Sequence, residues 1–239
     1  STPNDFGVKG KKPTHPELLD WLARELIRGG GRLKPVHKLI LLSSAYRQSG
    51  AYDRERAAKD PDNRLLWRRA PARLEAEIIR DSVLEVGGLL DKTMFGKGTL
   101  NEAMTRRSIY FMIKRSKVIP SMQLFDSPEP LVSQGSRPKT VIAPQALLFM
   151  NSPHVRKSAM KFMEKLQGTS SAKEAVARGY QLALSRRPTD TERAAAGAFV
   201  SRQEASYAKA GRDDKESRRL ALADFCQVLF GLNEFIYIE

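Results

Sequence analysis

Five basic side chains gather in one short stretch of the sequence with no acid between them. They are Arg106, Arg107, Lys114, Arg115 and Lys117. A guanidinium group binds carboxylate, sulfate or phosphate through two parallel hydrogen bonds, and a lysine adds a point charge. The stretch therefore predicts a platform for an anionic ligand. The alternative is that these arginines pair with acids inside the fold, such as Asp126 or Glu129.

The same stretch carries the clearest strand signal in the chain. Ile109, Phe111 and Ile113 alternate with Tyr110, Met112 and Lys114, and a period of two is typical of a β-strand. Such a strand would place Tyr110, Met112 and Lys114 on one face of the platform.

A second group of candidates lies in the proline-rich segment that follows, 120–144. Its periodicity is weak, and a long irregular loop in a compact domain is usually functional or mobile. Asp126 could act as a general base, but one carboxylate without an identifiable acid partner does not define a reaction. Arg137, in the same segment, is a further candidate for ligand binding.

The histidines and the cysteine do not form a recognisable metal or nucleophile motif. His15, His37 and His154 are far apart, and none has a second metal ligand three or four residues away. A capping or surface position accounts for His15 and His154. The single cysteine, Cys226, is expected to pack in the core of an apolar helix. We therefore expect no metal site and no cofactor in this chain.

The elements that must position these residues are mostly helical. Apolar side chains recur at helical spacing from Thr14 to Gly29 and from Pro35 to Gly50, which predicts a helical hairpin. Thr14 and Glu17 fit a capping box, as do Thr189 and Glu192. Further helices are predicted around 79–90, 153–167, 172–186, 192–210 and 217–230.

The predicted fold is mainly α, a multi-helix globular domain with at most a small two-stranded β element. The segment Phe235 to Ile238 suits a short strand that could pair with Ile109 to Ile113. We expect one domain over 1–239, with helical subdomains 1–104 and 144–239 joined by the strand and long loop of 105–143.

The net charge indicates that a partner of this chain would be negatively charged. The 239 residues carry 41 Lys and Arg against 27 Asp and Glu, a formal net charge of +14. Nucleic acid, anionic polysaccharide and acidic lipid or protein surfaces would all be attracted, and a basic surface without a specific partner has the same composition. No apolar run approaches the ~20 residues of a membrane span.

Several sequence blocks occur in a characteristic order. They include HPELLDWLARELI, LKPVHKLILLSSAYRQSG, RRSIYFMIKR, LFDSPEP, APQALLFMNSP and LSRRPTDTER. In this order the blocks resemble the planctomycete-type C-terminal domain of unknown function that follows a cytochrome-c-like domain in large exported proteins, the DUF fifteen-fifty-three family. The resemblance spans essentially the whole chain and implies that it is a C-terminal part of a larger protein.

The resemblance also implies where to look for a site. The family's blocks fall on the borders of the long loop, at Arg106, Arg107, Tyr110, Arg115, Phe125, Asp126, Thr140, Pro144, Gln145, Asn151 and Ser152. Gln145 and Asn151 therefore join the binding candidates. The family has no established catalytic residues to transfer.

Three functions follow as expectations. The first is a binding or scaffold module of an exported protein, periplasmic or at the cell surface, that recognises anionic polysaccharide or a partner domain. The second is part of an oxidoreductase or carbohydrate-active enzyme that passes electrons to a c-type haem in an upstream domain, with Asp126, Tyr110 or His37 as proton carriers. The third is nucleic-acid binding through the basic surface, which an exported location argues against.

Overall fold

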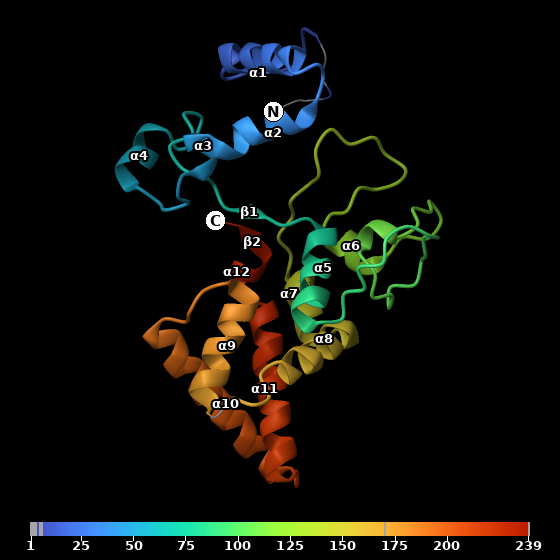
Figure 1. Cartoon of the computed structure of the whole chain (residues 1–239), viewed down its shortest axis with the longest axis vertical. Helices are drawn as coiled ribbons and strands as arrows, with labels where there is room; N and C mark the ends of the chain where they lie inside the picture. Colours follow the sequence, from blue (N-terminus) through green and yellow to red (C-terminus); the bar gives the residue numbers. More distant parts are fainter. Residues whose placement is uncertain (1–3, 5–6, 170, 239) are drawn as a thin grey trace. The chain divides into compact units, whose positions relative to one another are not determined.

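The computed structural model describes residue 4, residues 7–169 and residues 171–238, and over these residues the protein is mainly helical (Figure 1). It divides into two compact units. Unit 1 comprises the described residues of 1–72 together with 134–136, and unit 2 comprises those of 73–133 and 137–238. The predicted mainly α fold with a minimal β element is confirmed.

Unit 1 contains the predicted helical hairpin. Its helices are α1 (Pro16–Arg28), α2 (Leu33–Leu42), α3 (Ser44–Arg47) and α4 (Arg54–Lys59). Helix α1 packs against α2, and the turn between them needs Gly30 and Gly31, whose φ angles are 66° and 74°. No residue of α1 or α2 is fully buried.

Unit 2 contains the hydrophobic core. Its helices are α5 (Ala76–Gly87), α6 (Pro120–Leu124), α7 (Ala143–Asn151), α8 (Pro153–Glu164), α9 (Ala172–Leu184), α10 (Asp190–Lys209), α11 (Asp214–Phe230) and α12 (Asn233–Ile236). Helix α11 packs against α8, α9 and α10 (Figure 1). The Phe230 ring lies 5.7 Å from that of Phe162 and 5.2 Å from that of Phe235, so α8, α11 and α12 share one aromatic cluster. Cys226 is fully buried in this core, as predicted.

Helices α5 and α8 approach closely at a glycine. A Cβ atom added to Gly87 would lie 3.0 Å from the backbone oxygen of Ser158, so any other residue there would push α5 and α8 slightly apart. The contact fixes the spacing between two helices that wall the cavity described below. Across residues 7–169 and 171–238, no helix combines the length and apolar character that a bilayer span requires.

The predicted strand over Ile109 to Ile113 is wrong. The structure has a 3₁₀ turn at Ser108–Tyr110, and Phe111 forms only an isolated bridge with Thr99. The physical reason is Asp81, whose Oδ1 accepts hydrogen bonds from both the amide (2.8 Å) and the hydroxyl (2.7 Å) of Ser108 and so turns the chain. Tyr110, Met112 and Lys114 therefore do not form one face of a strand.

The C-terminal strand exists but has a different partner. Strand β2 (Tyr237–Ile238) pairs with β1 (Ala72–Arg73) in a two-stranded sheet, and the amide of Leu74 donates to the carbonyl of Ile236 at 2.8 Å. The predicted pairing with the 109–113 segment is wrong, because Tyr110 and Met112 in that segment already exchange backbone hydrogen bonds with Thr99.

One of the two predicted capping boxes is present. Thr189 accepts from the amide of Glu192 at 3.2 Å, and the Glu192 carboxylate accepts from the amide of Thr189 at 2.7 Å. The box at Thr14 is wrong, because Pro16 is the first residue of α1 and makes His15 the N-cap. Helix α11 begins earlier than predicted, at Asp214, since the Asp213 carboxylate caps it through the amide of Glu216 at 2.8 Å.

Acid is expected to weaken the junction that Glu192 makes with Arg186. Both Nη atoms of Arg186 donate to the Glu192 carboxylate, at 2.7 and 2.8 Å, and Arg186 also donates to the Glu234 carboxylate on α12 at 2.6 Å. The hydrogen bonds from Arg186 and then from the Thr189 amide lower the pKa of Glu192 to about 2 from 4.5. The stability that Glu192 contributes is therefore present above its ordinary pKa and is lost as the pH falls toward its folded pKa.

The measurement is urea unfolding of the Glu192→Gln variant and the wild type at about pH 6 and about pH 3. We expect the variant to be less stable at the higher pH and the difference to shrink at the lower pH. Glu129→Gln, at an exposed position, is the matched control and should show no such trend. A difference for Glu192→Gln that is constant with pH would contradict the assignment.

Candidate functional site

The basic cluster lies in an excursion between α5 and α6, residues 92–117, called the basic loop below. It contains seven Lys and Arg residues and one acid, Glu102. The seven are Lys92, Lys97, Arg106, Arg107, Lys114, Arg115 and Lys117. In Figure 1 these green loops lie beside α5 and α6 of unit 2.

Arg106 and Tyr110 hold the basic loop together. The Arg106 guanidinium lies 3.6 Å from the centre of the Tyr110 ring and donates to the carbonyls of Thr93, at 3.1 Å, and of Phe95. The amide of Phe95 donates to the Tyr110 hydroxyl at 2.6 Å. Thr99 exchanges backbone hydrogen bonds with Tyr110 and Met112 at 3.0 and 2.9 Å. The guanidinium of Arg106 is thus occupied by the protein's own carbonyl groups.

Arg80, on α5, anchors the base of the basic loop. Its guanidinium donates to the carbonyls of Arg106, at 3.1 Å, and of Met104, and to the Ser108 hydroxyl at 3.2 Å. It also lies 4.7 Å from the centre of the Phe111 ring, and its side chain is only 12% exposed. Burial lowers the pKa of Arg80, an effect that the neighbouring acids Asp81 and Glu102 oppose. An arginine remains protonated in proteins even so, and Arg80 is a buried charge that depends on these acceptors.

The remaining cations of the basic loop face solvent. Lys97, Lys114, Arg115 and Lys117 are exposed, and within the described part of the chain none of them has an ion-pair partner. Arg107 is 61% exposed and lies 3.6 Å from Asp81. Pairing with Asp126 or Glu129, the alternative considered for this cluster, does not occur for any of these side chains among the described residues.

Asp126 is held by hydrogen bonds at the end of α6. Its backbone is left-handed, with φ 60°, and its carboxylate accepts from Arg73 Nη2 at 2.6 Å and from the amide and hydroxyl of Thr140, each at 2.8 Å. Burial raises the pKa of Asp126, but the hydrogen bonds from Arg73 and Thr140 outweigh it and leave the pKa below its ordinary value. The ionised carboxylate closes the two ends of the long loop, and its role as a general base stays a prediction.

Gln145 joins the same network. Its side-chain amide donates to the carbonyls of Leu124, at 2.9 Å, and of Thr140, at 3.1 Å, and the residue is buried. The structure therefore brings Asp126 and Gln145 together around Thr140. Arg137 pairs instead with Glu77 at 2.6 Å and Glu75 at 3.6 Å, and Asn151 is exposed at the end of α7.

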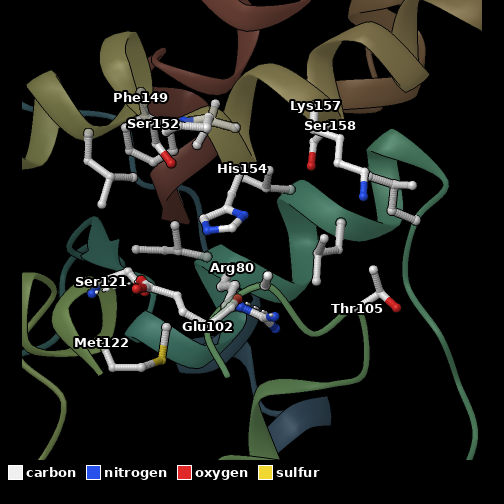
Figure 2. Close-up of a pocket in the computed structure, with 18 of the residues that line it drawn as sticks. Arg80, Glu102, Thr105, Ser121, Met122, Phe149, Ser152, His154, Lys157 and Ser158 are labelled. Atoms are coloured by element: carbon white, nitrogen blue, oxygen red, sulfur yellow. Dashed lines mark hydrogen bonds between the residues drawn. The ribbon is translucent and has the colours of Figure 1, made fainter. Parts of the chain in front are cut away.

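A cavity of about 280 Å³ opens in unit 2 between α5, α6, α7 and α8 (Figure 2). Its inner wall is apolar and includes Ile79, Val83, Met122, Phe125 and Phe149. Its polar lining residues are Arg80, Glu102, Thr105, Ser121, Ser152, His154, Lys157 and Ser158. Figure 2 shows the imidazole of His154 projecting into the space across from Arg80 and Glu102.

None of the nine predicted binding residues lines this cavity. Sequence patterns did not point to Arg80 and Lys157, which line the cavity, or to Arg73, which binds Asp126, and they favoured a capping or surface position for His154. Two signals were available: Arg80 directly follows a residue of the apolar stripe of α5, and His154 and Lys157 share the first turns of a helix without an acid there. His37, the third proposed proton carrier, is exposed on α2 in unit 1.

Metal ligands are not clustered in the part of the chain that the structure describes, where no three His, Cys, Asp or Glu side chains are grouped to hold an ion. A family model described as PSD1, a protein of unknown function (DUF1553), matches residues 1–200. No curated protein and no solved structure matches the chain.

Proposed function

The chain belongs to the PSD1 family of proteins of unknown function (DUF1553), and from that premise we propose that it is a binding module whose basic loop recognises an anionic polysaccharide. The observation that carries the proposal is the group of exposed cations at Lys97, Lys114, Arg115 and Lys117, which have no ion-pair partner among the described residues. Sulfate and carboxylate groups along a polysaccharide chain are acceptors for such side chains. The proposal places the module in an exported protein that has a cytochrome-c-like domain upstream.

The turn at the tip of the basic loop suits this role. The amide of Lys117 donates to the carbonyl of Lys114 at 3.1 Å and closes a four-residue turn that presents Lys114, Arg115 and Lys117. Because the backbone of the turn is already ordered, binding has to immobilise only the side chains. Phe95 and Ile113 are 78% and 84% exposed and offer apolar surface to the less polar faces of sugar rings.

The test is a comparison of two triple variants that change the net charge equally. The first is Lys114→Ala with Arg115→Ala and Lys117→Ala, and the matched control is Lys209→Ala with Lys215→Ala and Arg218→Ala, three exposed cations near the turn between α10 and α11. Binding to heparin and to polygalacturonate is measured calorimetrically at about 0.15 M salt. We expect the first variant to lose at least about tenfold in affinity, or about 1.4 kcal/mol, and the control to lose less than about twofold.

Equal losses in the two variants would overturn the proposal, because net charge alone would then explain the binding. If binding by the wild type vanished at physiological salt, net charge alone would again explain it, and the proposal would be overturned. Tighter binding to duplex DNA than to either polysaccharide would favour the nucleic-acid alternative. Arg106 is left intact in this design, because its replacement would remove hydrogen bonds that order the loop rather than a contact to ligand.

A further inference from the structure

We propose that the cavity of unit 2 is a second binding site, for a small amphipathic carboxylate. The apolar body of the ligand would lie against the inner wall, and the carboxylate would lie at the mouth, beside the N-terminal turn of α8. This site is separate from the basic loop tip, since the two share no residue.

The inner wall fits an apolar body. Val83 on α5, Met122 on α6 and Phe149 on α7 converge there from three helices, and all three are buried. Small-molecule sites are concave and mostly apolar, with roughly 300–1,000 Å³ of space, and contain a few polar groups that fix the ligand's orientation. At about 280 Å³ the cavity is slightly smaller than that range, so it fits a single ring or a short acyl chain.

The mouth favours a negative charge. Helix α8 begins without a side-chain cap and without an acid in its first turn, so the positive end of its dipole is not compensated there. The basic side chains of the lining are His154 and Lys157, from the first two turns of α8, and Arg80, which comes from α5 and lies across from His154 (Figure 2). Glu102 is the one acid among the lining residues, and its carboxylate already accepts a hydrogen bond from the amide of Ser121 at 3.1 Å.

Two hydroxyl groups in the lining have no partner. The Oγ atoms of Ser121 and Ser158 are buried and make no hydrogen bond within the described residues, and Ser158 as a whole is fully buried. Figure 2 shows the Ser158 hydroxyl on the cavity side of α8. A buried hydroxyl without a partner is unfavourable, and a ligand oxygen would supply the missing hydrogen-bond acceptor. A carboxylate supplies acceptors for such a hydroxyl and for the charged side chains of the lining.

The experiment uses the full chain and four probes. Octanoate and 3-phenylpropionate carry the proposed chemistry, octanol is the neutral counterpart, and inorganic phosphate is an anion without an apolar body. We expect saturable binding of at least one of the two carboxylates, with octanol and phosphate each at least about tenfold weaker than that carboxylate. The pair of carboxylates distinguishes a ring from an acyl chain.

Three variants locate the site. Lys157→Ala is expected to weaken carboxylate binding about threefold to tenfold, whereas Lys161→Ala, one turn further along α8 and outside the cavity lining, should leave it unchanged. Ala103→Trp places a large side chain at the mouth from an exposed loop position and should abolish binding without unfolding the protein. Circular dichroism and thermal unfolding confirm that each variant is folded.

Several results would overturn the inference. They are no binding of either carboxylate at millimolar concentration, binding of octanol as tight as that of octanoate, and carboxylate binding that survives Ala103→Trp. The triple variant at Lys114, Arg115 and Lys117 separates this site from the basic loop. It should bind the carboxylates normally, so the polysaccharide proposal and the cavity inference can fail independently.

Discussion

The Asp126→Ala variant is expected to lose about 3–5 kcal/mol of unfolding free energy, because the substitution leaves a buried arginine without its counter-ion. The side chains of Arg73 and Asp126 are 5% and 11% exposed, and their closest nitrogen and oxygen atoms are 2.6 Å apart. The same carboxylate accepts two hydrogen bonds from Thr140, which would also be lost. Urea unfolding at neutral pH measures the difference.

Two companion variants separate charge from packing. Asp126→Asn keeps the size of the side chain but not its charge, so it should recover only a minor part of the lost stability. Arg73→Met combined with Asp126→Ala removes both charges and should be more stable than Asp126→Ala alone. If the unfolding free energy of Asp126→Ala were within about 0.5 kcal/mol of the wild-type value, the ion pair would not be needed to hold the loop.

The pH dependence of this pair has a defined sign. The pKa of Asp126 is lowered in the folded protein, so the stability it contributes is present above the ordinary pKa of an aspartate and is lost as the pH falls through the folded value. If Asp126 served instead as a general base, it would need a pKa near the operating pH. The two roles therefore predict opposite shifts of the Asp126 pKa. The hydrogen bonds from Arg73 and Thr140 favour the lowered pKa of a structural ion pair.

Helices could be predicted from sequence wherever a local pattern determines them. The capping box of Thr189 and Glu192 starts α10 as expected, and the apolar stripe of Val155, Ala159 and Phe162 is the buried face of α8. Each of these signals depends on residues within a few turns of one another, so no tertiary information is needed. The same holds for the burial of Cys226, which its apolar neighbours indicate.

The strand at 109–113 could not be judged from sequence, because a distant residue decides it. The alternation of Ile109, Phe111 and Ile113 is real, yet Asp81 binds Ser108 across 27 residues of chain and imposes a turn. Exposure shows the outcome: Ile109 and Ile113 are 73% and 84% exposed instead of facing a core. Tertiary hydrogen bonds here override a local β propensity.

The candidate site shows the same division. The basic character of the segment from Arg106 to Lys117 could be predicted from sequence. Which of its cations are bound within the loop, and which are not, could not be predicted. Arg106 is used for carbonyl groups of its own loop, whereas Lys114 and Lys117 remain free of ion pairs among the described residues. The cavity could not be predicted at all, because its lining comes from four helices and a loop whose juxtaposition only the fold creates.

The Arg80→Met variant is expected to lose about 3 kcal/mol of unfolding free energy and to release the basic loop. Methionine keeps much of the length and apolar surface of the side chain but donates no hydrogen bonds. The carbonyls of Met104 and Arg106 and the hydroxyl of Ser108 then lose their shared donor. Arg107→Ala, at a 61% exposed side chain 3.6 Å from Asp81, is the matched control and should change stability by less than about 0.5 kcal/mol.

Cleavage by trypsin measures the release of the basic loop directly, because the loop contains seven Lys and Arg residues at which trypsin can cut. We expect rapid cleavage within 92–117 in Arg80→Met under conditions where the wild type and Arg107→Ala resist. Glu102, Ala103, Met104 and Thr105 also line the cavity, so the same variant should weaken both polysaccharide and carboxylate binding. A variant that is cleaved no faster than the wild type would show that Arg106 and Tyr110 alone suffice to order the loop. Arg80 would then serve the cavity wall only, and carboxylate binding would fall while polysaccharide binding stayed constant.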